Sequence, residues 1–378
     1  MRQKMSWRTE GPKNTQGTIR SMIPIFLCLL AGLFCLLAFP AQAEETVVNG
    51  YTADRPLTLY THESVRGGLA FTAGSSYYSE KLYPGDTYTV SHRVNLPEGA
   101  SVKTARLYNY WSWSAEGTTG RYPELSLRFE DEEIEPGTEY SDRKGWGSYD
   151  YPSGTWAYDV SEYIDGSRVY STCIENKGPG TSYFCIDGVG LLIIYTDPNG
   201  KDLEYWISEG ADLLNSQLDK NGNPEFGAAP SMTICEMMKP SLSLPIRSAT
   251  LWTVTRAGNW EDNTLWINNA SFPGICAGRP YPDLEIDTTD ITDYLRDGEN
   301  SIRFQAVGDF VLPSNAILAV EINPGAVKSP EPSEETLESS ETAGNHETEA
   351  KEAPGFGVQW AFSLLLVSWA LAGKGRNS

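Results

Sequence analysis

Histidine is scarce in this 378-residue chain, and the motifs of several large enzyme classes are absent. Of three histidines, His346 lies in an acidic segment near the C-terminus, while His62 and His92 are far apart in sequence. No Gly-x-Ser-x-Gly, His-Glu-x-x-His or glycine-rich phosphate loop occurs. These absences exclude the classes built on those motifs, and we expect a protein that is not an enzyme and needs no cofactor.

Basic residues are also few. The chain has 29 Lys and Arg against 50 Asp and Glu, a net charge of −21. Such a surface repels nucleic acid, so we expect no nucleic-acid partner. It suits a salt-rich or cation-rich exterior, where charge repulsion is screened over short distances.

Helical periodicity is nearly missing between Thr46 and Pro324. Short runs rich in Val, Ile, Tyr, Trp and Thr are separated by Gly, Pro, Asn and Asp, which is typical of strands and turns. Examples of such runs are 87–94, 104–113, 125–129, 190–195, 249–255, 301–307 and 316–322. The sequence therefore predicts an all-β protein.

Two segments recur in the same order in both halves of this region. Residues 101–108 parallel 245–252 at an offset of 144, and residues 159–164 parallel 290–295 at an offset of 131. Each half also ends on a strand closed by Asp-Pro or Asn-Pro. These recurrences in the same order indicate an internal duplication. We predict two tandem antiparallel β-sandwich domains, jelly-roll-like, over 44–200 and 201–325. The run 290–302 resembles a turn-and-strand of jelly-roll domains that accompany glycosidases, which implies a fold and not sugar binding.

Both ends of the chain predict export. Residues 1–43 combine a basic start, an apolar run from Met22 to Phe39 and Ala41-Gln42-Ala43, which is the pattern of a cleaved signal peptide. An uncleaved N-terminal anchor is the alternative. Residues 326–353 hold eight Glu and no aromatic residue, so we expect an acidic disordered stalk.

The last 25 residues, 354–378, add an anchoring signal. Pro354-Gly355-Phe356 precedes an apolar run of about 15 residues, which is shorter than a usual membrane span. The segment resembles the PGF-type sorting signal of archaeal surface proteins, which implies a sorting enzyme as partner and a lipid anchor at the cell surface. A single C-terminal transmembrane helix is the alternative contact with the membrane.

Four cysteines remain outside the signal peptide: Cys173, Cys185, Cys235 and Cys276. An even number in an exported chain indicates disulfides, with three possible connectivities. If the chain turns about Pro179, Cys173 and Cys185 face each other across a hairpin, and the other two pair by elimination. The cysteines have no CxxC spacing and no neighbouring His, so nothing in the sequence indicates a zinc site. The Asp219–Asn223 run resembles the start of an EF-hand loop but lacks its last ligand. We therefore expect no metal. The sequon at Asn269 predicts an N-glycan.

Three features together suggest a family: the strand at 188–195, G-V-G-L-L-I-I-Y, the segment S-A-T-L-W at 248–252, and the PGF signal. With them the chain resembles an uncharacterised family of exported archaeal proteins, found largely in methanogens and built from tandem β-domains. The resemblance carries no known reaction, so it assigns no catalytic residue.

Aromatic residues give the clearest indication of binding. Trp111 and Trp113 align with Thr255 and Ala257 of the second repeat, so the shared fold does not require aromatics there. The first repeat is also 13 residues longer between the matched segments, in a region that holds Trp146, Tyr149 and Tyr151. These five aromatics are the candidate ligand-binding residues. Alternatively, they cover the end of the sandwich.

The predicted function is that of a non-enzymatic, anchored cell-surface protein for adhesion, envelope structure or binding of an extracellular ligand. Its expected partner is an extracellular glycan or a surface-layer protein. The alternatives are a surface carbohydrate-binding module and a glycosidase-like enzyme. A glycosidase would need a carboxylate pair, which has no fixed spacing, and the candidates are Asp131, Glu132, Glu133, Asp283 and Asp287.

Overall fold

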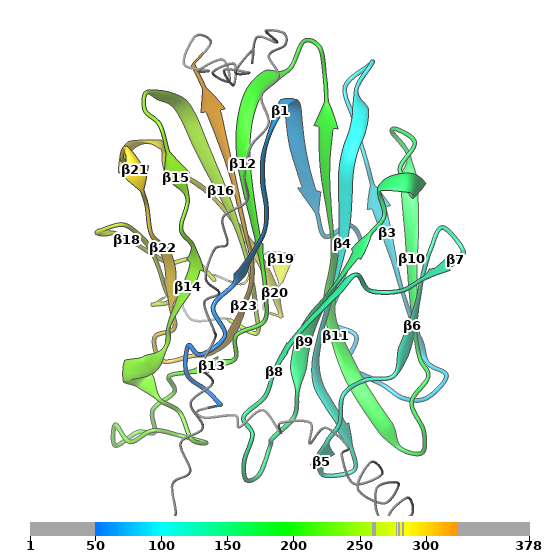
Figure 1. Ribbon diagram of the computed structural model, residues 1–378. Coiled ribbons are helices and arrows are strands. Elements are labelled where there is room, and N and C mark those ends of the chain that lie inside the picture. Colours follow the sequence, from blue (N-terminus) through cyan, green and yellow to red (C-terminus); the bar gives the residue numbers. More distant parts are fainter. Residues whose placement is uncertain (1–49, 259–261, 277, 279, 282, 324–378) are drawn as a thin grey trace, which may run out of the picture. The chain divides into compact units, whose positions relative to one another are not determined.

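A computed structural model of the chain describes residues 50–323 except 259–261, 277, 279 and 282 (Figure 1). Strands dominate these residues, and the helical turns are short 3-10 segments: η1 (Ser161–Tyr163), η2 (Pro230–Met232) and η3 (Thr292–Tyr294). The all-β prediction is confirmed. In this part of the chain no helix is long and apolar enough to cross a membrane. The signal peptide, the acidic stalk and the sorting motif Pro354-Gly355-Phe356 lie outside the described residues.

The first half of the chain forms an antiparallel sandwich. Its inner sheet contains β11 (Ser182–Thr196), β4 (Ser101–Glu116), β9 (Ser153–Asp159) and β8 (Thr138–Asp142), extended by β2 (Lys81–Leu82) and β5 (Thr119–Gly120). Its outer sheet contains β3 (Thr87–Arg93), β10 (Val169–Asn176), β6 (Leu125–Phe129) and β7 (Glu132–Ile134). Leu107, Trp111 and Leu191 of the inner sheet pack against Phe129 and Tyr170 of the outer one.

The second half repeats this arrangement (Figure 1). Its inner sheet contains β12 (Lys201–Glu209), β23 (Phe310–Ile322), β16 (Ile246–Arg256), β20 (Leu284–Asp290) and β19 (Pro280–Tyr281), and β13 (Leu214–Asn215) pairs with β23. Its outer sheet contains β14 (Ile234–Met238), β22 (Ile302–Gln305), β17 (Thr264–Ile267) and β18 (Ala270–Pro273), and β15 (Ser241–Leu242) pairs with β21 (Gly298–Glu299). Leu251 and Leu318 pack against Leu265 and Phe304 in its core.

One strand belongs to both sandwiches. Residues 58–67 of β1 (Thr58–Thr72) pair with β12, and residues 67–72 pair with β11. Gly67 lies where the pairing changes partner, and a Cβ there would come within 2.0 Å of the Tyr195 carbonyl oxygen. The two inner sheets are thereby one hydrogen-bonded sheet from β19 to β8. The domain boundary predicted between residues 200 and 201 falls in the turn from β11 to β12.

A third apolar core lies between the two inner sheets. Side chains alternate along each inner strand, so Leu107 faces the first sandwich core while Tyr108 and Tyr110 face this third one. Tyr205 and Ile317 reach it from the second half. Both faces of the inner strands are therefore buried, which explains the continuous apolar run at 188–195.

The two repeats are built with matching contacts. The amide of Ala105 donates to Ser161 Oγ at 2.8 Å, and that of Ala249 donates to Thr292 Oγ1 at 2.8 Å. These pairs correspond at the offsets of 144 and 131 found in the sequence. In each repeat the short 3-10 turn is thereby fixed to the start of the long inner strand.

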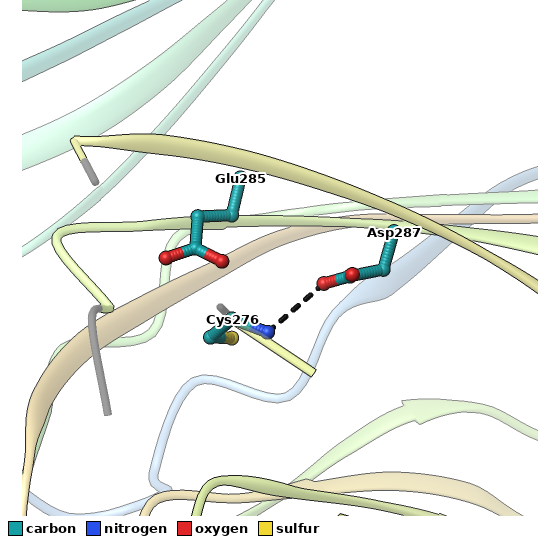
Figure 2. A group of neighbouring side chains, drawn as sticks. All are labelled: Cys276, Glu285 and Asp287. Carbon is teal, nitrogen blue, oxygen red and sulfur yellow. Dashed lines mark hydrogen bonds between the residues drawn. The ribbon is translucent and has the colours of Figure 1, made fainter. Parts of the chain in front are cut away.

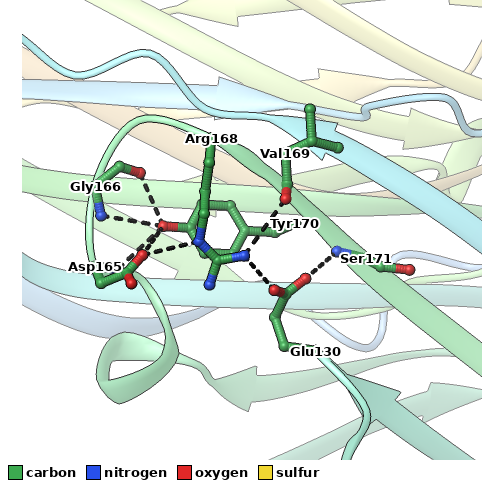
Figure 3. Close-up of polar contacts among 7 residues, drawn as sticks. All are labelled: Glu130, Asp165, Gly166, Arg168, Val169, Tyr170 and Ser171. Carbon is green, nitrogen blue, oxygen red and sulfur yellow. Dashed lines mark hydrogen bonds and ion pairs between the residues drawn. The ribbon is translucent and has the colours of Figure 1, made fainter.

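A polar cluster lies on the outer sheet of the first sandwich (Figure 3). Arg168 forms ion pairs with Asp165 and Glu130, and its guanidinium lies 3.9 Å from the centre of the Tyr170 ring. The Glu130 carboxylate also accepts a hydrogen bond from the amide of Ser171 at 2.5 Å. The cluster joins the β6–β7 turn to β10 near solvent, where ion pairs stabilise little.

The disulfide prediction is wrong in this structure. Cys173 lies on β10 of the outer sheet and Cys185 on β11 of the inner sheet, because residues 177–181 cross between sheets and form no hairpin. Cys235 is in the second core, and the Cys276 sulfur lies 2.9 Å from Thr255 Oγ1. All four thiols are free. Asn269, the predicted glycan site, is exposed in the turn between β17 and β18.

Candidate functional site: an aromatic groove between the sandwiches

A cavity of about 460 Å³ opens where the two sandwiches meet. Both halves of the chain line it, and half of its lining residues are aromatic. The residues are Tyr51, Trp113, Tyr149, Asn215, Gln217, Phe226, Ala257, Asp283, Asp309 and Phe310. Ligand sites often lie at such boundaries, because two rigid units supply the walls.

Backbone geometry places Trp113 in this cavity. The pairing of β4 with β11 shifts register between Ser112 and Ala115, which is a β-bulge. Trp113 there has φ +54°, so its side chain leaves the alternation that buries Trp111. Ala257, its counterpart in the second repeat, has φ +56° and lines the same cavity. Left-handed backbone at non-glycine residues is costly and gathers at functional sites.

Ring contacts fix the cavity wall. Trp113 stacks on Phe310 with ring centres 5.2 Å apart and an angle of 21° between the planes. Tyr151 meets the Trp113 ring edge-on at 6.4 Å, and Tyr51 meets Phe310 edge-on at 5.7 Å. Such pairs are stabilising beyond the area they bury, so this wall is ordered before any ligand arrives.

The rim carries two exposed rings. Tyr149 is 56% exposed and Phe226 is 60% exposed. They lie edge-to-face with centres 6.3 Å apart and come from opposite halves of the chain. Large rings held together yet open to solvent are unusual on a soluble surface and mark contact sites.

A second cavity of about 840 Å³ adjoins the first and shares Trp113 and Tyr149 with it. It is lined by Tyr78, Glu80, Lys81, Tyr83, Trp113, Tyr149, Tyr151, Tyr183 and Cys185. Lys81 Nζ lies 4.0 Å from the centre of the Tyr183 ring. We call the two cavities together the aromatic groove.

Polar groups stand among the rings of the first cavity. Burial raises the pKa of the Asp283 carboxyl above its usual range. Asp309 accepts a hydrogen bond from Asn263 Nδ2 at 2.7 Å, and Asn215 Oδ1 accepts one from the Gln217 amide at 2.9 Å. The groove thus combines flat apolar faces with hydrogen-bonding groups of fixed position.

The structure divides the five predicted aromatics. Trp113, Tyr149 and Tyr151 lie together in the groove, but Trp111 does not bind there because it is 0% exposed in the first core. It packs so closely on β9 that a Cβ on Gly154 would come within 2.4 Å of its ring. Trp146 is half-exposed and lines neither cavity. Lys144 Nζ lies 4.1 Å from the centre of its ring.

Sequence reasoning missed the contribution of the second half. Phe226 comes one residue after Gly-Asn-Pro and Phe310 directly after Gly-Asp, so an aromatic residue close behind turn residues was the available signal. Of the candidate carboxylates, Asp283 lies in the groove, while Asp131, Glu132 and Glu133 lie at the β6–β7 turn of the outer sheet.

Two groups of side chains have the spacing of metal ligands, in contrast to the expectation from sequence. Cys276, Glu285 and Asp287 place one ligand atom each within 4.8 Å of one another (Figure 2). Asp287 accepts a hydrogen bond from the Cys276 amide at 3.0 Å, and burial raises the pKa of the Cys276 thiol well above its usual range. The Cys276 sulfur lies 2.9 Å from Thr255 Oγ1, so the thiol and Asp287 already have partners within the protein. The second group is Asp54, Asp142 and Asp212.

Comparison with known proteins identifies a family. Residues 50–321 match the family described as "Protein of unknown function (DUF3344)". The chain belongs to the DUF3344 family. The match covers both sandwiches of this DUF3344 protein, while the archaeal origin and the sorting signal stay predictions. A search of curated proteins returns no match.

Solved structures resemble the DUF3344 protein only distantly. They include PNGase F, a glycosylasparaginase from Flavobacterium meningosepticum, at 11% identity and a TM-score of 0.22, covering 68% of this chain and 97% of that one. Another is an α-L-rhamnosidase from Streptomyces avermitilis, at 14% identity and a TM-score of 0.17, covering 70% of this chain and 28% of that one. A cycloalternan-forming enzyme from Listeria monocytogenes follows at 10% identity and a TM-score of 0.18, covering 67% and 22%. Scores this low carry no functional argument.

Proposed function

We propose that the protein binds an extracellular carbohydrate in the aromatic groove and is held at the cell surface by its C-terminal segment. The observation that carries the proposal is the pair of exposed rings, Tyr149 and Phe226, beside the ordered stack of Trp113 on Phe310. Sugar rings present flat C–H faces that pack on aromatic faces.

The polar groups suit the other surface of a sugar. Hydroxyl groups need donors and acceptors in fixed places, and Asn215, Gln217 and Asp283 offer both kinds among the rings. A net charge of −21 favours a neutral glycan over an anionic one. The sequence of the two ends supports the surface location, with a sorting enzyme and the membrane as further partners.

Glycan-array binding of the whole protein tests this function. We expect Tyr149→Ala and Phe226→Ala to weaken binding about tenfold or more, as losses of anchor residues commonly do. Tyr294→Ala is the control, because this ring on η3 is also exposed but lines neither cavity. A binding signal that survives both groove variants and disappears in the control would contradict the proposal.

Glycoside hydrolysis is the second candidate. Asp283 and Asp309 line the same cavity, and the raised pKa of Asp283 is what a general acid requires. Incubation with a glycan panel followed by product analysis distinguishes the two. Turnover that is lost in Asp283→Asn would favour an enzyme, while binding without products in any reaction would leave the protein a lectin-like binder.

A further inference from the structure

Three aspartates from distant parts of the chain meet between the sandwiches. Asp54 precedes β1, Asp142 ends β8, and Asp212 lies between β12 and β13. One carboxylate oxygen of each lies within 4.8 Å of the others. Asp142 is 2% exposed and Asp212 is 0% exposed, so two of the three are inside the protein.

Hydrogen bonds hold these carboxylates in place but leave one oxygen over. Asp142 accepts from the amides of Arg143 at 2.7 Å and Leu213 at 2.8 Å. Asp212 Oδ1 accepts from the amide of Arg55 at 3.1 Å. Asp212 Oδ2 is buried and accepts no hydrogen bond from nitrogen or oxygen among the described residues. The Cys235 thiol, a weak donor, is the polar side chain beside this carboxyl, and it lowers the pKa of Asp212. Burying an acceptor without a hydrogen bond costs free energy, because the oxygen loses its contacts with water. A cation bound at this oxygen would remove that cost.

The site disfavours ionisation of its carboxyl groups. Burial raises the pKa of both Asp142 and Asp212 to about 7, and Asp54 raises each further by repulsion. The charge of Arg55 offsets part of this effect for Asp212. Two buried carboxylates kept this close need added positive charge to ionise fully.

We propose that Asp54, Asp142 and Asp212 bind a divalent cation, Ca²⁺ in the first place. Calcium takes oxygen ligands at about 2.3–2.6 Å, so two ligands on opposite sides of the ion lie about 4.6–5.2 Å apart. The three oxygens lie within 4.8 Å of one another, close enough for one calcium ion to contact all three. Magnesium would draw the oxygens closer and keeps more of its water, so it binds more weakly here.

Such an ion would fasten the groove as well as the sandwiches. Asp142 comes from the first half, and the segment that follows it carries Tyr149 and Tyr151. Asp212 comes from the second half, three residues before the groove residue Asn215. Calcium binding is measured without any glycan, so its outcome is independent of carbohydrate binding.

Calorimetric titration of the EDTA-treated whole protein with CaCl₂, at about 0.15 M salt to screen the acidic surface, tests the site. We expect one ion per chain and a rise in Tm of roughly 5 °C at saturating calcium. Asp142→Asn and Asp212→Asn should weaken binding at least tenfold and abolish the shift. MgCl₂ should bind more weakly than CaCl₂ in the same titration.

Matched variants separate this site from unspecific binding by acidic residues. Asp219→Asn is the control, because Asp219 is a partly exposed carboxylate outside the site that accepts hydrogen bonds from the backbone amides of Asn221 and Asn223. If the buried variants fail to fold in EDTA, the exposed residue of the site takes their place as Asp54→Asn. Calcium binding that is absent in the wild-type protein, or unchanged in every site variant, overturns the proposal.

Discussion

Arg256 of the second sandwich forms an ion pair with Asp187 of the first, with N and O atoms 3.2 Å apart and both side chains buried. Arg256 also donates to the Trp111 carbonyl at 2.8 Å and to Ser314 Oγ at 2.9 Å, and Ser112 Oγ donates to Asp187 at 2.6 Å. Burial lowers the pKa of Arg256 and raises that of Asp187 to about 6, so the pair is ionised at neutral pH.

Removing one partner of this pair should therefore be more harmful than removing both. Asp187→Asn leaves the Arg256 charge buried, and we expect a loss of about 3–5 kcal/mol in the free energy of unfolding. A double variant, Asp187→Leu with Arg256→Met, should recover part of that loss. Urea unfolding of the four proteins measures the coupling, and strictly additive losses would show that the pair does not act as a unit.

Separate expression of the two halves tests how far they share one structure. Fragments 50–200 and 201–323 would each expose the third core and leave Arg106 or Glu209, a second buried pair between halves, without its partner. We expect neither fragment alone to unfold cooperatively, and the mixed fragments to recover a folded complex. Circular dichroism during heating decides this, and two cooperative fragments would instead establish independent domains.

The seven strands named from the sequence all overlap observed strands, because their alternation and turn residues are local signals. The sequence did not single out β1, β10 and β12, which lie inside the sheets. It located the matched segments, whose contacts at Ala105 and Ala249 correspond in space. The third core and the groove were harder, since a buried Tyr108 and a groove-lining Phe310 look alike in sequence. Trp111 is buried and Trp113 lines the groove because of a β-bulge in β4, and neither composition nor spacing predicts that bulge.

The strained backbone of the groove yields a paired prediction. Ala257→Gly removes the steric cost of φ +56° and should stabilise the protein by up to about 1 kcal/mol, with glycan binding unchanged. Trp113→Gly removes similar strain at φ +54° but also the stack on Phe310, so it should lose binding. Thermal unfolding and array binding measured on both variants test this, and equal effects on binding would refute a special role for Trp113.

The buried histidine of the first sandwich predicts how stability depends on pH. His92 is fully buried on β3, faces the core beside Gly74, and neither ring nitrogen has a hydrogen-bond partner among the described residues. Burial lowers its pKa to about 4, from 6.5 in an unfolded chain. The unfolded chain therefore takes up a proton first as the pH falls, so His92 contributes full stability above pH 6.5 and loses it towards pH 4.

The shift corresponds to a loss of about 3 kcal/mol across that window. Other groups titrate there too, and Asp187, with a pKa raised to about 6, changes stability in the opposite direction. His92→Leu isolates the histidine, because it keeps an apolar side chain in the core and removes the titration. Urea unfolding between pH 4 and pH 6.5 should show a smaller loss in the variant than in the wild-type protein, and parallel profiles would exclude His92 as the source.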